Sequence, residues 1–153
     1  MAVTSVHSSG RHDHVAQPMD GAMPRWLQQT FDAVADSVPA VRHLVGGRLR
    51  ALGLGALAGD LELVAAELVT NAIRHGAGPV DVLLRVTSAT DRERVRLEVH
   101  DRGGGVPALR PPHADGPAIG GWGLRMVDKV ADGWGVEVGG GRTVVWAELT
   151  AHR

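Results

Sequence analysis

The chain has 153 residues, the length of one compact domain with tails, and is long enough to bury roughly 70% of the surface that its unfolded form would expose. Its 16 basic and 17 acidic residues give a net charge of -1, so we expect neither direct nucleic-acid binding nor attraction to an anionic membrane. The chain has no cysteine, no long apolar run and no signal-peptide-like start, which excludes disulfides and thiolate metal sites and indicates a cytoplasmic protein.

The N-terminal half predicts a tail, a strand and a first helix. Residues 1–23 are polar and lack periodicity, which is typical of a disordered tail, and we place the folded domain at 24–150. "RWLQQTF" suits an edge strand. A helix is expected to begin at Ser37, with Pro39 in its first turn. Its apolar face comprises Val41, Leu44, Val45 and Leu52.

A second helix is predicted from a cap at Asp60 to His75, where Gly76 ends it. Its apolar residues recur at helical spacing and predict a buried stripe, which comprises Leu61, Val64, Ala65, Leu68 and Ala72. Glu67 and Asn71, four residues apart, project together from the margin of this stripe.

The C-terminal half predicts two hairpins separated by a loop and a short helix. "VDVLLRV" and "RVRLEVH" alternate with period two and form an antiparallel hairpin with one solvated face. Glycine and proline break all periodicity in "DRGGGVPALRPPHADGPAIGGWG", which predicts a long loop. "LRMVDKVA" follows as a helix, and "GVEVGGGRTVVWAEL" as a hairpin turning at 139–141. This order predicts an α+β fold, a two-layer sandwich with helices on one face of a mainly antiparallel, mixed sheet.

Polar and glycine-rich elements recur at the ends of these predicted segments, and each has an ordinary structural explanation. Glu67 and Asn71 could be a solvated helix edge, and "DRGGG", which begins at Asp101, a tight turn. "GGWG" could be a flexible connection, and Thr143 simply a strand residue. A Walker-type phosphate loop is excluded, because Lys129, the single lysine, lies within a predicted helix.

The four motifs become specific when they are taken together and in order. "ELVTNAIRHG", "DRGGGVP", "GGWGL" and "GGRTVVWAEL" resemble the N box and the three glycine boxes of the GHKL ATPase superfamily, which has the Bergerat ATP-binding fold. "SVPAVR" and "VDKVADGWGVE" are similar to segments of bacterial anti-sigma-factor serine/threonine kinases. The resemblance covers about residues 25–150.

The resemblance implies a role for particular residues in binding ATP and Mg2+. Asn71 would ligate Mg2+, and Glu67 would act on the attacking hydroxyl or water as catalytic base. Asp101 would accept a hydrogen bond from the adenine amino group. The remaining nucleotide contacts would come from an ATP lid at about 106–121 and from Gly103, Gly105, Gly121, Gly123, Leu124 and Thr143.

The resemblance also implies a regulator that phosphorylates a serine or threonine of an anti-sigma-factor antagonist of the STAS type, binds a sigma factor and forms a homodimer. A binding module in which ATP controls partner affinity without useful phosphoryl transfer is the alternative. Two features keep that alternative open. Trp122 stands in the second glycine box where a polar or basic residue is more familiar, and neither Arg110 nor Arg125 can be assigned as the γ-phosphate cation.

Overall fold

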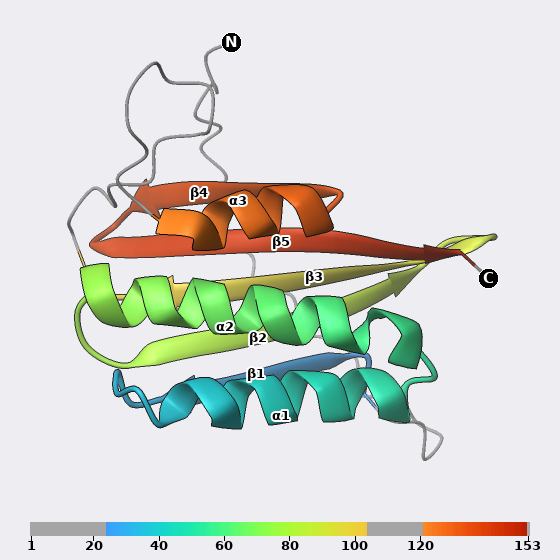
Figure 1. Cartoon of the computed structure of the whole chain (residues 1–153), viewed down its shortest axis with the longest axis horizontal. Coiled ribbons are helices and arrows are strands. Elements are labelled where there is room, and N and C mark those ends of the chain that lie inside the picture. The colour runs from blue at the N-terminus through green and yellow to red at the C-terminus, as the bar shows by residue number, and fades with distance from the viewer. Residues whose placement is uncertain (1–23, 104–120, 153) are drawn as a thin grey trace, which may run out of the picture.

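The computed structural model describes residues 24–103 and 121–152, which form a five-stranded sheet with three α-helices on one face (Figure 1). The predicted tail at 1–23, Gly105 and nearly all of the predicted lid, Arg110 included, lie outside the described residues. The elements are, in chain order, β1 (Trp26–Phe31), α1 (Ser37–Ala51), the 3-10 helix η1 (Gly55–Leu57), α2 (Ala58–His75), β2 (Val80–Ser88), β3 (Arg92–Asp101), α3 (Gly121–Val130), β4 (Gly133–Gly139) and β5 (Arg142–His152).

The sheet has the strand order β1-β2-β3-β5-β4, so β3 is the middle strand and β1 is at an edge, as predicted. All of its pairings are antiparallel within the described residues, so the expectation of a mixed sheet was wrong. Both predicted hairpins are confirmed. In the second, Gly140 and Gly141 turn the chain with φ of 59° and 72°, a conformation that side chains with a Cβ rarely adopt.

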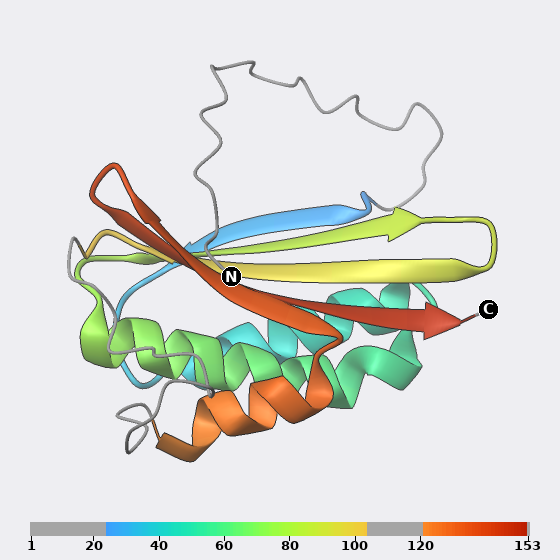
Figure 2. The same cartoon turned by 90° about the horizontal axis from the view of Figure 1, so that it is seen from above.

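Alternation along β3 divides the sheet into two faces of different character. Val95, Leu97 and Val99 are buried under the helices. Their neighbours point to the other face, which no helix of the described chain covers (Figure 2). We call this second surface the open face. The predicted α+β, two-layer arrangement is therefore confirmed.

Helix α2 lies at the centre of the helical layer and packs against α1, α3 and the sheet (Figure 1). All five residues of the predicted stripe are buried, and Val69 joins them. Burial of each large aliphatic side chain contributes about 1.5–3 kcal/mol, so this stripe is a major source of stability. No helix in the described ranges is both long and apolar enough to cross a membrane.

The predicted N-cap of α2 was wrong by three residues. The helix begins at Ala58, its N-cap is Leu57, and Asp60 lies in the first turn without capping the helix end. The physical reason is that η1 runs directly into α2, so the chain is already helical before Asp60 is reached. The third helix likewise begins earlier than predicted, at Gly121.

A charged network on the open face centres on Arg96. Its guanidinium lies 2.7 Å from a Glu98 oxygen and 3.1 Å from a Glu148 oxygen, and it stacks over the Trp146 ring with 4.2 Å to the centroid. On the other side of Glu98, the His100 Nε2 lies 2.9 Å from the carboxylate. These partners lower the pKa of Glu98 from 4.5 to about 2, with His100 as the largest cause and burial opposing the change.

We expect this network to make stability fall in acid. The pKa of Glu98 is lower in the folded than in the unfolded chain, so its contribution is present above pH 4.5 and is lost as the pH falls toward about 2. The free energy of unfolding of the wild type, measured by chemical denaturation, should fall between these two pH values. In Glu98→Gln this fall should be smaller by on the order of 1–3 kcal/mol. Asp91→Asn, at an exposed turn residue, is the control and should leave the decrease unchanged. An unchanged decrease in Glu98→Gln would contradict the assignment.

Candidate functional site

Most of the residues selected from the sequence lie at one end of the molecule. The C-terminal end of α2, the last residues of β3, the first residues of β5 and the start of α3 lie at the same end in both views (Figures 1 and 2). Antiparallel pairing of β3 with β5 produces part of this convergence, since it sets Asp101 directly beside Thr143. The fold therefore gathers four separate motifs into one region.

Asp101 is the last residue of β3 and is only 6% exposed. Its Oδ1 accepts a hydrogen bond of 2.7 Å from the Gly103 backbone N–H. Thr143 is 2% exposed, and its hydroxyl donates to the Gly103 carbonyl oxygen over 3.1 Å. Thr143 thus fixes Gly103, which in turn fixes one oxygen of the Asp101 carboxylate. A buried carboxylate held in this way is a rigid hydrogen-bond acceptor.

Two glycines pack against the Asp101 side chain. A Cβ at position 76 would lie 2.5 Å from the Asp101 Cγ and 2.5 Å from the Ala72 carbonyl oxygen. A Cβ at position 103 would lie 2.9 Å from the Asp101 Oδ1. Gly103 was selected from the sequence, but Gly76 was expected only to end α2. Its position one residue after "NAIRH" was the available signal for a second role.

Gly76 does end α2, but with an extended backbone at φ -91° and ψ -170°. The following residue, Ala77, accepts a hydrogen bond of 3.0 Å from the Arg102 N–H through its carbonyl oxygen. This bond ties the segment after α2 to the segment after β3. The two backbones can approach this closely because Gly76 and Gly103 lack side chains.

Asn71 and Glu67 lie on the last turns of α2. Asn71 is 8% exposed, and its Nδ2 is buried without a hydrogen-bond partner among the described residues. A buried amide N–H without a hydrogen-bond partner costs about 1–3 kcal/mol. Such groups are often found where a bound ligand accepts the hydrogen bond. Glu67 is half-buried and has no hydrogen bond or ion pair with the described part of the chain. A solvated helix edge does not describe Asn71.

Gly121, Gly123 and Leu124 lie in the first turn of α3, where helix N–H groups have no partner within the helix. Leu124 is buried and fixes this turn to the core. Trp122 belongs to the same turn. Arg125, the residue after Leu124, is exposed. The helix start can therefore offer backbone donors to an anion.

No cluster of three or more His, Cys, Asp or Glu side chains suited to a metal occurs in 24–103 or 121–152. A hard cation at Asn71 would therefore take most of its oxygens from water and from a phosphate ligand, as Mg2+ does. The buried Asn71 Nδ2, which has no partner among the described residues, fits a site in which a phosphate oxygen of such a ligand accepts a hydrogen bond from it.

A family model described as the histidine kinase-like ATPase domain matches residues 31–149. The chain belongs to this ATPase family. The resemblance to the GHKL superfamily that its four motifs predicted is thereby confirmed.

One similar solved structure agrees with the family assignment at the level of fold. The RsbU and RsbW domains of Rv1364c from Mycobacterium tuberculosis match with 22% identity and a TM-score of 0.62, over 86% of this chain and 33% of that one. This chain therefore spans about a third of that structure's length. A histidine kinase domain from Erythrobacter litoralis matches with 30% identity and a TM-score of 0.42, over 60% of this chain and 43% of that one. No curated protein matches the chain.

Because Gly76 packs on Asp101, we expect Gly76→Ala to weaken nucleotide binding. The added methyl must displace the carboxylate or the Ala72 carbonyl, at a cost of about 1–3 kcal/mol in stability. ATP affinity, measured by isothermal titration calorimetry, should fall at least tenfold. Gly47→Ala is the control, since a Cβ at that position of α1 meets nothing within 4 Å. Equal ATP affinity in wild type and Gly76→Ala would show that Gly76 does not position Asp101.

Proposed function

We propose that this ATPase-family domain binds Mg-ATP at the end of the sheet and transfers its γ-phosphate to a serine or threonine of an anti-sigma-factor antagonist. The observation that carries the proposal is the buried Asn71 Nδ2, which has no hydrogen-bond partner among the described residues and lies one turn after Glu67 on α2. A fold that leaves a polar group unsatisfied at this depth is stabilised when a ligand supplies the missing partner.

Asp101 would select the nucleobase. One carboxylate oxygen is held by the Gly103 N–H, which leaves the other to accept a hydrogen bond from the adenine amino group. Guanine presents an acceptor oxygen at the corresponding position, and two facing acceptors repel one another. Gly103 allows the base to approach the backbone closely.

Asn71 and the first turn of α3 would hold the phosphates. The Asn71 amide supplies an oxygen for Mg2+ and an N–H for a phosphate oxygen, and its burial fixes it at the helix end. The free N–H groups of Gly121, Gly123 and Leu124 favour the phosphate charge, together with the dipole of α3. When bound, Mg2+ neutralises phosphate charge as the transfer proceeds.

Glu67 would act as the base for transfer. The substrate hydroxyl oxygen forms a bond to the γ-phosphorus while the bond from that phosphorus to the β–γ bridging oxygen breaks, and ADP leaves. The hydroxyl proton passes to a Glu67 carboxylate oxygen. A half-buried carboxylate without a partner in the described chain is available for this role.

The assignment of partners rests on the motifs that resemble anti-sigma-factor kinases, and the fold similarity to a structure with an RsbW domain supports it. We infer a sigma factor and a STAS-type antagonist as binding partners, a homodimeric assembly and a cytoplasmic location. The net charge of -1 supports a protein partner over direct binding to nucleic acid.

We expect Asp101→Asn to alter nucleobase selection more than folding. With Oδ1 still accepting from Gly103, the new amide would present a donor to the adenine amino group, and donor would face donor. Competition binding should show at least a hundredfold loss of ATP affinity and a higher ratio of GTP to ATP affinity. Asp128→Asn, an exposed carboxylate of α3, should bind both nucleotides like wild type. An unchanged ATP-to-GTP ratio in Asp101→Asn would remove Asp101 from base recognition.

Glu67→Gln should retain Mg-ATP binding and lose at least a hundredfold in phosphoryl transfer, since the amide cannot accept the proton. Wild type and Glu67→Gln, each immobilised with Mg-ATP, would capture partners from a lysate of the source cells, and phosphoserine and phosphothreonine would be mapped by mass spectrometry. A captured small protein phosphorylated by wild type alone establishes the kinase and its substrate. Equal capture by both proteins without phosphorylation would instead support the ATP-controlled binding module.

A further inference from the structure

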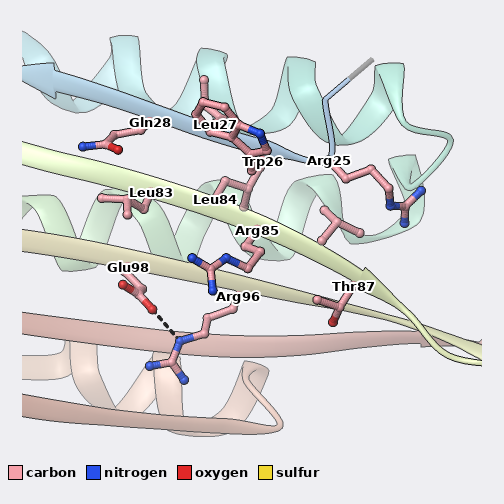
Figure 3. A pocket seen from close by; sticks show the side chains of 11 residues that line it. Arg25, Trp26, Leu27, Gln28, Leu83, Leu84, Arg85, Thr87, Arg96 and Glu98 are labelled. Carbon is pink, nitrogen blue, oxygen red and sulfur yellow. Dashed lines mark hydrogen bonds and ion pairs between the residues drawn. The ribbon is translucent and has the colours of Figure 1, made fainter. Parts of the chain in front are cut away.

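The open face carries a hollow over β1 and β2, on the side of the sheet away from the helices (Figure 3). Its volume is about 710 Å3, which lies within the usual range of sites for small organic ligands. The apolar part of its lining includes Trp26, which is 44% exposed, and Leu83, which is half-buried. An indole and a leucine side chain left in water on one concave surface favour a ligand with an apolar body.

Positive charge exceeds negative charge around this hollow. Arg25, Arg85 and Arg96 line it, and Glu98 is the one carboxylate among its described lining residues. Arg25 forms an ion pair with the buried Glu93, and Arg96 lies 2.7 Å from a Glu98 oxygen. Arg85 is exposed and has neither an ion pair nor a hydrogen bond with any described residue. The Arg85 guanidinium is therefore the charge of this hollow that the described chain leaves uncompensated.

The strand register adds a reason why Arg85 favours an anion. Arg85 of β2 lies directly opposite Arg96 of β3, and the two side chains project from neighbouring strands of the open face (Figure 3). Two residues along β2, Thr87 lies opposite Arg94, which is exposed and also has no partner in the described chain. Like charges opposite one another on adjacent strands destabilise a sheet. A bound anion beside Arg85 would reduce this repulsion.

The same register orders apolar and charged groups across the hollow. Trp26 of β1 lies opposite Arg85 of β2, so an indole and a free guanidinium are neighbours in one row. In the next row, Leu83 of β2 lies opposite Gln28 of β1. A ligand that spans the two strands would therefore meet an apolar surface at one end and a guanidinium at the other.

We propose that this hollow binds a small aromatic carboxylate. The flat apolar body of the ligand would stack on the Trp26 indole and cover Leu83. Its carboxylate would accept hydrogen bonds from the Arg85 guanidinium, whose planar fork matches the two carboxylate oxygens. The Thr87 hydroxyl is a further donor in the lining, and Arg94 adds attraction from the neighbouring strand.

The rest of the open face favours a small ligand over a large partner. The Arg96 guanidinium already has carboxylate oxygens at 2.7 Å in Glu98 and 3.1 Å in Glu148. Asp81 accepts a hydrogen bond of 2.6 Å from the Thr30 hydroxyl. A partner that covered the whole face would take these charged groups out of water, which is costly. A ligand confined to the hollow leaves them unchanged and contacts the part of the face where Arg85 lacks a partner.

The proposal goes beyond the proposed function and does not depend on it. The hollow lies on the face of the sheet away from the helices, whereas Asn71 belongs to α2 and Asp101 is buried on the helical side of β3. Binding in the hollow can therefore be measured with the nucleotide site either empty or occupied.

Nuclear magnetic resonance on the full-length, 15N-labelled chain tests the site with two matched probes. 1-Naphthylacetate has a flat apolar body and one carboxylate, and 1-naphthylacetamide has the same body without the charge. Naphthylacetate should shift the Trp26 indole N–H signal and the backbone N–H signals of 83–87, with a dissociation constant below about 1 mM. The neutral amide should bind about tenfold more weakly, because it loses the charge-assisted hydrogen bonds.

Two variants separate the charged contact from the apolar one. Arg85→Gln should weaken naphthylacetate binding about tenfold and leave naphthylacetamide binding unchanged, since it removes the charged partner alone. Trp26→Leu should weaken the binding of both probes about fivefold, because both stack on the indole. Arg42→Gln, at an exposed position of α1 on the helical side, is the control and should bind both probes like wild type. Circular dichroism checks folding, and if Trp26→Leu fails to fold, Arg85→Gln decides the question.

Unshifted Trp26 and 83–87 signals in millimolar naphthylacetate would overturn the proposal, as would equal binding of the two probes or unchanged binding in Arg85→Gln. Shifts that disappear when Mg-ATP is added would place the probe at the nucleotide site instead. Shifts of the same signals that follow protein concentration without any probe would show that a second copy covers the hollow. A chain that binds naphthylacetate in the hollow but does not bind ATP would reject the proposed function and retain this site.

Discussion

The packing of α2 against the sheet is the constraint on which the rest of the structure depends. The side chains of Leu61, Val64 and Leu68 are buried between the helix and the strands, and they fix the rotation of α2 about its own axis. That rotation determines which side of the helix is left at the margin. Asn71 is therefore held beside the core, where its Nδ2 has no hydrogen-bond partner among the described residues. A helix that was rotated by one residue would bury Glu67 or expose Asn71.

The second constraint is the pairing of β3 with β5, which places Asp101 and Thr143 at the same end of the molecule as Asn71. Asp101 and Thr143 are neighbours only because the long connection between the two strands returns the chain to the middle of the sheet. Their contact runs through Gly103, whose N–H and carbonyl group serve one residue each. The register of β3 and β5 therefore fixes the position of the Asp101 carboxylate through the backbone of Gly103.

The sequence predicted those parts of the fold that local periodicity determines, and it missed those that depend on approach between distant segments. The stripe of α2 and the alternation of β3 were correct because burial on one face imposes a period on a single segment. The predicted start of α2 was wrong because aspartate commonly caps helices, which favoured Asp60. The 3-10 helix η1 runs directly into α2, so the chain is already helical before Asp60. The contact of Gly76 with Asp101 joins positions 25 residues apart, and no local pattern records it.

The alternation of side chains along β3 limits which mutations the chain can accept during evolution. Even-numbered residues such as Arg96 and Glu98 belong to the open face, while odd-numbered ones such as Val99 and Asp101 face the helices. Point substitutions can therefore remodel either surface and leave the other intact. Insertion or deletion of one residue within the strand would exchange the two sets and destroy both surfaces together. We expect homologues to vary in the length of the β2–β3 turn at 89–91 while keeping the spacing within β3 constant.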